Sequence, residues 1–445
     1  MVNRYINRRY LGGFVISAAE VLNNKVIPLN EGIVFISRSN LRPIFRKMLK
    51  ELGIEDITTP DTFEACILEL AKNDNALFIL DWTDNKEEAS KLLSAAQGRF
   101  ACDTRPIFLL TQDAPYELYG LAAEYNVTRV HSGDISVKTI SANLSQIIAD
   151  EANSSSFRKK ISRIAQIQIS GDWKKSEKYI NELLNEHVDD PVLLGELINN
   201  SIQLNHWDEA YQHSQKLNAL YPVNIRGMHL LARCKMKQGL FDEAREILKN
   251  ASIINPFNPQ RLVDLGTAYL YTGSTEKANE SFTQALELKS DLISAQKGLS
   301  KCLLLEGDIN EALVLLKTFS SSLELASVFN DAAIISIHSG KYDEGLKLYK
   351  AAIKALKDKN QIIAKLLFNI GIAHFKLNDL EQAYKFFKYS MEKDSSFESA
   401  VHNVRVCERQ IHQTDKERSH ETTPEDQKNS ELVDQFNESF EDESF

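Results

Sequence analysis

The chain is poor in the residues that interrupt or crosslink secondary structure. Its 445 residues include only 18 glycines, 10 prolines and five cysteines. Because glycine and proline both disfavour helix interiors, their scarcity favours a largely helical protein. The cysteines are odd in number and no two are close in sequence, which argues against a disulfide framework and against a zinc site. We therefore expect a reducing, cytoplasmic environment.

Long apolar and long basic stretches are also missing. No run approaches the roughly 20 apolar residues of a membrane span. Arg8 and Arg9 precede an apolar run at 10–19 that is short and lacks a clear cleavage site, so we expect no secretory signal. No basic block points to nucleic acid. The formal charge is −10, and residues 414–445, with 11 acidic and 3 basic residues, contribute −8 of it.

Familiar catalytic signatures are absent as well. The sequence contains no glycine-rich phosphate loop, no H-E-x-x-H and no G-x-S-x-G. We therefore predict a non-enzymatic protein without a catalytic residue, cofactor or metal, whose partners are other proteins rather than nucleic acid or membrane.

What the sequence does contain is a recurring six-residue pattern. Each copy starts with Gly or Asn, which favours the left-handed turn at the end of a helix. An acidic residue follows where the next helix begins and its dipole favours negative charge. A small residue then permits close helix packing. The copies are Gly171–Ser176, Asn205–Ala210, Gly239–Ala244, Gly273–Ala278, Gly307–Ala312, Gly340–Gly345 and Asn378–Ala383, at steps of 34, 34, 34, 34, 33 and 38 residues.

This pattern resembles the tetratricopeptide repeat (TPR), with seven copies over residues 157–395. The resemblance implies an all-α solenoid of helix pairs that binds protein partners in its groove. Residues 396–413 then read as a capping helix. We expect its buried face to carry Phe397, Val401, Val404 and Ile411.

One face of the predicted array is rich in basic residues. In the repeat register, the first helix of each pair lines the concave surface. Basic side chains in the third copy recur at spacings of 3, 4 and 4, which places them on one helix face. We predict a protein-binding groove here, and the alternative is an ordinary solvated face. The residues are Arg226, His229, Arg233 and Lys237, with Lys297 and Lys301 two repeats later.

The first half of the chain has a different pattern. Short apolar runs at 33–36, 76–80, 106–110 and 127–130, with a weaker one near Ile57, alternate with amphipathic stretches. Five strands alternating with five helices indicate a doubly wound parallel (βα)5 sheet over residues 32–152, after an N-terminal extension at 1–31. Such a sheet binds ligands at the carboxyl ends of its strands. The predicted helices are 41–52, 62–71, 86–96, 116–125 and 135–148.

This segment resembles the receiver domain of bacterial response regulators, particularly the single-domain chemotaxis receiver. Phe45–Gly53 lies where that family has its first helix. Asp81 ends the third predicted strand, and Thr111 ends the fourth. The resemblance implies that Asp81 accepts a phosphoryl group and that Thr111 is the switch residue that senses it.

Two departures from the receiver pattern affect its chemistry. The acidic pair that holds Mg²⁺ in the family is replaced by Ile36 and Ser37, followed by Arg38. The Lys-Pro pair is replaced within Val130–Asp134. Since phosphoryl transfer needs cations around the phosphate oxygens, we expect neither Mg²⁺ binding nor self-phosphorylation. Arg38 is a candidate phosphate or carboxylate clamp. The alternative is that Asp81 is a purely structural residue.

The C-terminal residues 414–445 are polar and acidic, and we expect them to be disordered. Three phenylalanines, Phe436, Phe440 and Phe445, alternate with acidic residues near the end. This arrangement resembles a short recognition peptide. It would occupy the basic groove of its own chain or of a second copy, or else serve a separate partner.

Together these features predict a bacterial signalling adaptor whose receiver-like domain and repeat groove each dock a protein. The alternative is a response regulator that is phosphorylated at Asp81 and uses its repeats as output. A third possibility, a phosphatase of another receiver, has no candidate catalytic residue in the sequence.

Overall fold

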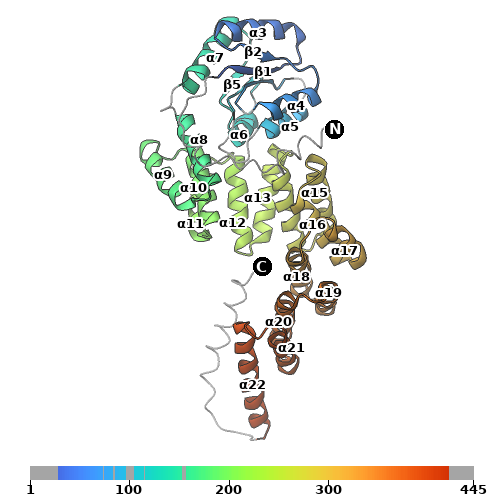
Figure 1. Ribbon diagram of the computed structural model, residues 1–445. Helices are drawn as coiled ribbons and strands as arrows, with labels where there is room; N and C mark the ends of the chain where they lie inside the picture. Colours follow the sequence, from blue (N-terminus) through green and yellow to red (C-terminus); the bar gives the residue numbers. More distant parts are fainter. Residues whose placement is uncertain are drawn as a thin grey trace. The chain divides into compact units, whose positions relative to one another are not determined.

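The computed structural model describes residues 29–419 except residues 74, 84–85, 97–104, 115 and 153–156. Figure 1 shows the order of helices and strands along the chain. The chain divides into two compact units, unit 1 (Met1–Ala268) and unit 2 (Tyr269–Phe445), which we describe separately. No helix within the described ranges is long and apolar enough to cross a membrane.

Unit 1 begins with the α/β domain, residues 29–152. Its five parallel strands have the order β2-β1-β3-β4-β5, which confirms the predicted parallel sheet. The strand β5 lies at 129–132, where 127–130 was predicted. The elements are β1 (Glu31–Phe35), the short 3-10 helix η1 (Ser39–Leu41), α3 (Arg42–Glu51), β2 (Asp56–Thr58), α4 (Phe63–Lys72), β3 (Leu77–Asp81), α5 (Lys86–Ala96), β4 (Ile107–Thr111), α6 (Tyr116–Glu124), β5 (Arg129–Ser132) and α7 (Val137–Ala152).

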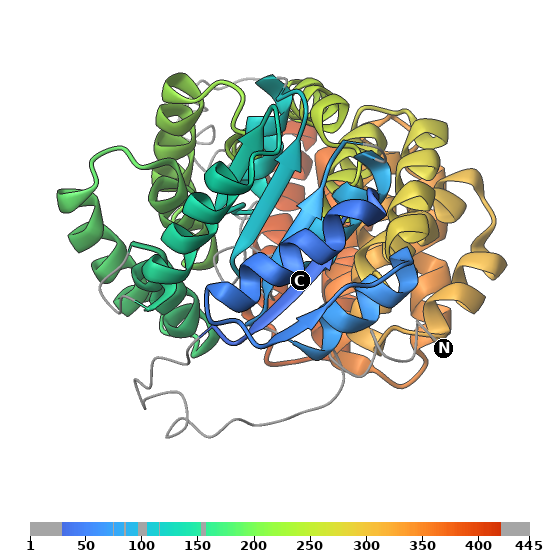
Figure 2. The same cartoon turned by 90° about the horizontal axis from the view of Figure 1, so that it is seen from above.

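Helices cover both faces of this sheet, as Figures 1 and 2 show. Successive side chains of a strand point to opposite faces. Phe78 and Leu80 therefore pack with α4 and α5, whereas Leu77 and Ile79 pack with α3 and α7. Because the central strands are buried on both sides, they are continuously apolar rather than alternating.

The repeats of unit 1 are antiparallel helix pairs. Gly171 and Gly239 have φ angles of 77° and 76°, so the turns between paired helices use the left-handed backbone that the sequence pattern predicts. The small residues Ala210 and Ala244 are fully buried in the second helices. The helices are α8 (Phe157–Ile169), α9 (Trp173–Glu186), α10 (Pro191–Gln203), α11 (Trp207–Leu220), α12 (Ile225–Lys237), α13 (Phe241–Ile254) and α14 (Pro259–Tyr271), the last of which runs into unit 2.

The α/β domain and the first repeats belong to one compact unit. The helix α6 contacts α12 and α13. Leu118, Leu121 and Tyr125 share one buried cluster with Ile225 and Ala251 of the repeats. The sequence predicts a domain boundary at residues 152–157. Unit 1 continues past this boundary as far as Ala268.

Unit 2 continues the same architecture, and the predicted TPR-like solenoid is confirmed. Its last helix differs from the prediction in two ways. The buried face of α22 carries Ala400, Val404 and Cys407, while the predicted Val401 and Ile411 are only half-buried and Phe397, also half-buried, precedes the helix. The helix also continues past residue 413. The helices are α15 (Thr275–Leu288), α16 (Ile293–Glu306), α17 (Ile309–Lys317), α18 (Ser322–His338), α19 (Tyr342–Leu356), α20 (Asn360–Lys376), α21 (Leu380–Lys393) and α22 (Glu398–Ser419).

Candidate functional site

The carboxyl edge of the sheet places Asp81 next to Arg38. Asp81 is the last residue of β3 and is buried. Arg38, just after β1, donates to its Oδ2 from Nε at 3.2 Å and from Nη2 at 3.0 Å. The Ser37 hydroxyl approaches the same oxygen at 3.5 Å, and the Thr83 backbone N–H donates to Oδ1 at 3.0 Å. Both carboxylate oxygens are thus engaged by protein donors.

Thr111 lies on the neighbouring strand at the same edge. It ends β4, where Asp81 pairs in register with Leu110. Its hydroxyl donates to the Asp113 carbonyl at 2.6 Å. The structure therefore brings the three candidate residues Arg38, Asp81 and Thr111 to one edge, but the hydrogen bond of Thr111 is directed to its own loop.

The predicted groove residues of unit 1, Arg226, His229, Arg233 and Lys237, lie on α12. We call the surface formed by the first helices of successive pairs, α8, α10, α12 and α14, the first-helix face. Arg226 donates from Nη2 to Glu196 Oε1 at 2.6 Å. Gln168 Nε2 donates to the other oxygen of Glu196 at 3.0 Å and to Asn200 Oδ1, also at 3.0 Å. These contacts connect the first helices of three successive repeats. Arg226 is therefore already paired with a buried carboxylate.

The other basic residues of this face have partners too. His229 Nε2 lies 2.7 Å from Asp264 Oδ2, and Arg233 Nε lies 4.0 Å from the same oxygen. The Lys237 ammonium lies over the Trp207 ring, 5.8 Å from its centroid. The first-helix face is thus a mixed-charge surface, less basic than the spacing of α12 alone suggests.

In unit 2, Lys297 and Lys301 are also ion-paired. Lys297 Nζ lies 2.8 Å from Glu324, and Lys301 pairs with Asp331. The hydrogen bond from Lys297, with further ones from Ser321, lowers the pKa of Glu324 to about 2. The carboxylate of Glu324 is therefore ionised throughout the neutral range.

Sequence reasoning missed the acidic partners Glu196, Asp264 and Asp331, although a signal was present. Arg226 and Glu196 are 30 residues apart, as are Lys301 and Asp331. Equivalent positions in adjacent repeats are 34 residues apart, and 30 residues is about one helical turn less than that. Side chains at this separation therefore meet between adjacent first helices. Searching for opposite charges at this separation would have predicted both pairs.

The described thiols offer no nucleophile. Cys66, Cys234, Cys302 and Cys407 are all buried and free. Burial raises the pKa of Cys66 and of Cys302 to about 12, so the reactive thiolate form is scarce at neutral pH.

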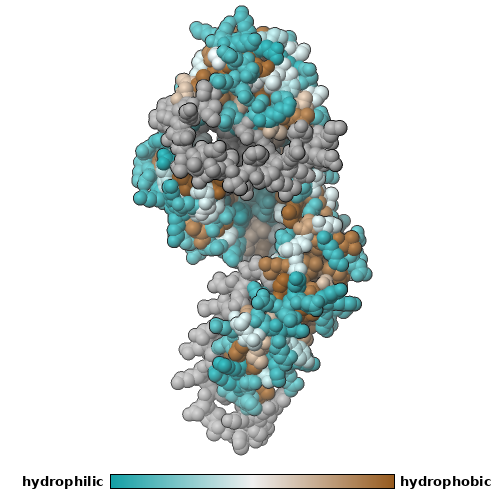
Figure 3. Space-filling view, viewed as in Figure 1, coloured by the Kyte–Doolittle hydropathy of each residue, from teal (hydrophilic) through white to brown (hydrophobic). Residues whose placement is uncertain are grey.

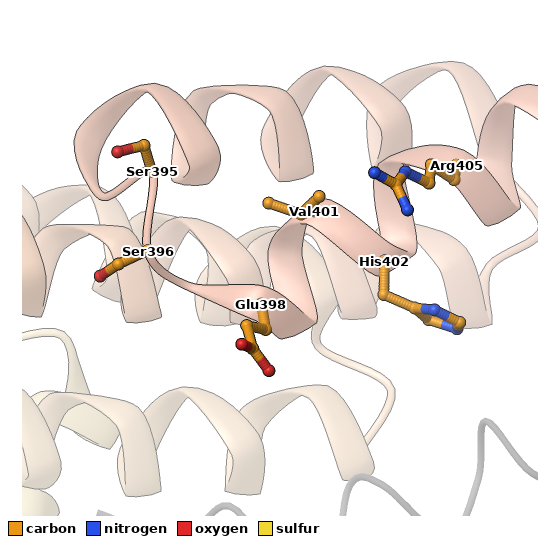
Figure 4. Close-up of a pocket in the computed structure, with 6 residues that line it drawn as sticks. All are labelled: Ser395, Ser396, Glu398, Val401, His402 and Arg405. Carbon is orange, nitrogen blue, oxygen red and sulfur yellow. The ribbon is translucent and has the colours of Figure 1, made fainter.

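Two further clusters could bind a ligand by composition alone. Within the described ranges, ligand atoms of Glu177, His206 and Glu209 lie within 4.8 Å of one another, but the last two residues are exposed. A shallow pocket of about 470 Å³ opens beside α22 (Figure 4). The pocket is lined by Ser395, Ser396, Glu398, Val401, His402 and Arg405.

The face of the molecule drawn in Figure 3 is mixed in character. Figure 3 shows hydrophilic residues interspersed with smaller hydrophobic areas. The predicted tail residues Phe436, Phe440 and Phe445 lie outside the described residues, and so do positions 1–28 of the N-terminal extension.

Comparison with known proteins identifies the repeats. Family models described as tetratricopeptide repeat match residues 201–265 and 259–292. The BBSome complex member BBS4 of Bos taurus is 28% identical over 191 residues, which cover 42% of this chain and 35% of the bovine protein. The TPR repeat-containing protein MJ1428 of Methanocaldococcus jannaschii is 27% identical over 165 residues, covering 37% of this chain and 28% of that protein.

A solved structure of a tetratricopeptide repeat protein from Parabacteroides merdae aligns with a TM-score of 0.38 and 15% identity, over 56% of this chain and 97% of that one. This chain spans only 35% and 28% of the two curated relatives. By the family models, residues 201–292 are tetratricopeptide repeats.

Proposed function

We propose that this chain is a bacterial signalling adaptor in which the α/β domain and the first-helix face each dock a protein partner. The repeats support the general part, since tetratricopeptide arrays bind proteins on their surfaces. The receiver role and the bacterial setting rest on the resemblance around Phe45–Gly53, Asp81 and Thr111.

The observation that favours an adaptor over a phosphorylated switch is the engagement of Asp81. Arg38 provides a fixed guanidinium at the carboxylate, and Ser37 and Thr83 approach its oxygens as well. A guanidinium forms directional hydrogen bonds to carboxylates and stays protonated. In this proposal Arg38 is a carboxylate clamp that keeps Asp81 closed to a phosphodonor.

Phosphorylation at Asp81 is the competing function, and it requires Arg38 to leave the carboxylate. Intact mass of the full chain after incubation with Mg²⁺ and a small phosphodonor tests this. We expect the wild type to stay unmodified. Phosphate uptake by the wild type that Asp81→Asn abolishes would contradict the adaptor proposal.

The docking role of the first-helix face has its own experiment. Arg233→Glu with Lys237→Glu reverses two charges on that face, of which Lys237 is exposed. Lys249→Glu, which reverses one charge on α13, is the control outside this face. A partner recovered with wild type should be lost with the double variant and kept with Lys249→Glu. A partner retained equally by all three forms does not bind this face. Occupation of the face by the tail stays a prediction.

A further inference from the structure

A single carboxylate dominates the polar part of the contact between α6 and the α13–α14 junction, where the third repeat meets the fourth. Glu124, the last residue of α6, is 6% exposed. Its Oε1 accepts from Arg261 Nη1 at 2.7 Å and from Asn258 Nδ2 at 2.8 Å. Its Oε2 accepts from Asn255 Nδ2 at 2.7 Å. Three side chains of this junction, Asn255 at the end of α13, Asn258 just before α14 and Arg261 on α14, thus converge on one acidic group of the α/β domain.

These donors are held in place by the repeat itself. Asn255 Oδ1 accepts from the Phe257 backbone N–H at 3.0 Å, and Asn258 Oδ1 accepts from the Arg261 backbone N–H at 3.0 Å. Because the amide oxygens face these N–H groups, the amide NH₂ groups face Glu124. Arg261 Nη2 is fixed by the Asn255 carbonyl at 2.5 Å. The site is therefore preorganised for a negatively charged acceptor.

The arrangement belongs to the junction between the third and fourth repeats and is not required by the repeat fold. One repeat earlier, the equivalents of Asn255 and Arg261 are Tyr221 and Gly227, and one repeat later Arg261 is replaced by Ala295. Asn224, the equivalent of Asn258, still caps its helix through the Gly227 N–H at 2.8 Å. Capping is thus shared with the neighbouring repeat, whereas Asn255 and Arg261 replace other residue types.

The α6 side is equally adapted to the contact. Gly120 lies one turn before Glu124, and a Cβ added there would lie 2.7 Å from the Val223 carbonyl oxygen. Glu124 is placed at the C-terminal end of α6, where the helix dipole disfavours negative charge. The carboxylate is therefore stabilised by the donors at residues 255–261, whereas its position on its own helix destabilises it.

We propose that residues 255–258 together with Arg261 form a carboxylate-selective docking site, that its occupant is α6 of the same chain, and that Glu124 latches the α/β domain onto the junction of the third and fourth repeats. Opening this latch would uncover the side chains of Leu121 on α6, of Tyr125 just after it and of Ile225 on α12, which belong to one buried cluster. The latch does not depend on whether Asp81 is phosphorylated or on which partners bind.

Hydrogen exchange of the full chain tests the latch. Glu124→Gln preserves shape but replaces one acceptor oxygen with a donor that faces other donors. We expect backbone amides of α6 and of residues 255–261 to exchange about tenfold faster or more. Amides of β3, β4 and α20 should be unchanged. Glu87→Gln, which removes a carboxylate from a surface pair on α5, is the matched control and should change neither set.

A second variant opens the same contact by another route. Gly120→Ala leaves Glu124 intact but introduces a steric clash with Val223, and it should produce the same segmental pattern. Unchanged exchange of α6 in Glu124→Gln would overturn the latch. So would equally faster exchange in β3, β4 and α20, because Glu124 would then be a general stability residue. Faster exchange of α6 in Gly120→Ala without any change at 255–261 would also contradict it.

Discussion

Two arginine–carboxylate pairs in unit 1 share their chemistry but differ in burial. At the sheet edge, the Arg38 side chain is 29% exposed while that of Asp81 is 1% exposed. At the latch, Arg261 and Glu124 are 1% and 6% exposed. A pair with one solvated partner can separate at modest cost, whereas breaking a fully buried pair strands a charge. The same residue types can therefore close a local site in one place and join two parts of the chain in another.

The largest effect is expected when the buried pair loses its cation. Arg261→Met leaves Glu124 without its guanidinium, and breaking a buried pair typically costs about 3–5 kcal/mol. We expect the free energy of unfolding of unit 1 to fall by up to that amount. Urea titration followed by tryptophan fluorescence reports unit 1 alone, because all three tryptophans, Trp82, Trp173 and Trp207, lie in it.

The matched control replaces both partners. Glu124→Leu with Arg261→Met removes the stranded carboxylate, and apolar replacement of a whole buried pair is often nearly neutral. The double variant should recover much of the lost stability. If Arg261→Met and the double variant unfold at the same urea concentration, the loss does not arise from an unpaired Glu124.

Acid should weaken the buried pair next. Burial alone would raise the pKa of Glu124, but the Arg261 charge and hydrogen bonds from Arg261, Asn255 and Asn258 outweigh it and leave the pKa below its ordinary value of 4.5. Because the folded pKa is lowered, the stabilisation is present above pH 4.5 and is lost as pH falls through the folded value. Urea titrations at successive pH values should show this loss. Glu124→Gln should remove that part of the pH dependence, and an unchanged profile would contradict the assignment.

A smaller effect is expected at the sheet edge. Arg38→Met removes two donors to Asp81, but the Ser37 and Thr83 contacts remain. Hydrogen bonds to charged groups contribute about 1.5–3 kcal/mol each at most, and Arg38 is partly solvated, so we expect a loss of about 1–2 kcal/mol. Trp82 is adjacent to Asp81 and should report it. If Arg38→Met lowered the free energy of unfolding as much as Arg261→Met does, burial would not distinguish the two pairs.

The smallest effect serves as the reference. The Lys91–Glu87 pair on α5 is exposed on both sides, with a separation of 2.7 Å. Pairs of this kind contribute about 0.3–0.5 kcal/mol. Glu87→Gln should therefore leave the urea midpoint almost unchanged, and a shift comparable to that of Arg38→Met would show that solvent exposure is a poor guide here.

Local patterns in the sequence predict most of the fold because they report local physics. The apolar runs at 76–80 and 106–110 predict the buried strands β3 and β4, and the Gly and Asn positions predict the turns between paired helices. The face of α22 was assigned less well. Val401 is apolar yet half-buried, and the buried face includes Ala400 and Cys407, which a search for large apolar residues overlooks.

The sites were harder to predict because their partners are distant in sequence. Glu124 and Arg261 are separated by 137 positions, and no periodicity joins an α/β domain to a repeat. One signal existed on the repeat side. Arginine at position 261 occurs where the neighbouring copies have Gly227 and Ala295, and a large charged residue at a small-residue position calls for a specific acceptor. The identity of that acceptor required the structure.

The residues that bind Glu124 at the α13–α14 junction limit where whole repeats can be added to the array or removed from it. Repeats of a solenoid are commonly gained or lost as whole units, since each contacts mainly its neighbours. Here the junction of the third and fourth copies carries Asn255 and Arg261, and replacing it with the junction of the second and third copies would place the equivalents of Tyr221 and Gly227 opposite Glu124. We therefore expect duplication or deletion to be tolerated more readily beyond the fourth copy than at this junction, which makes the third and fourth repeats the anchored, non-interchangeable members of the array.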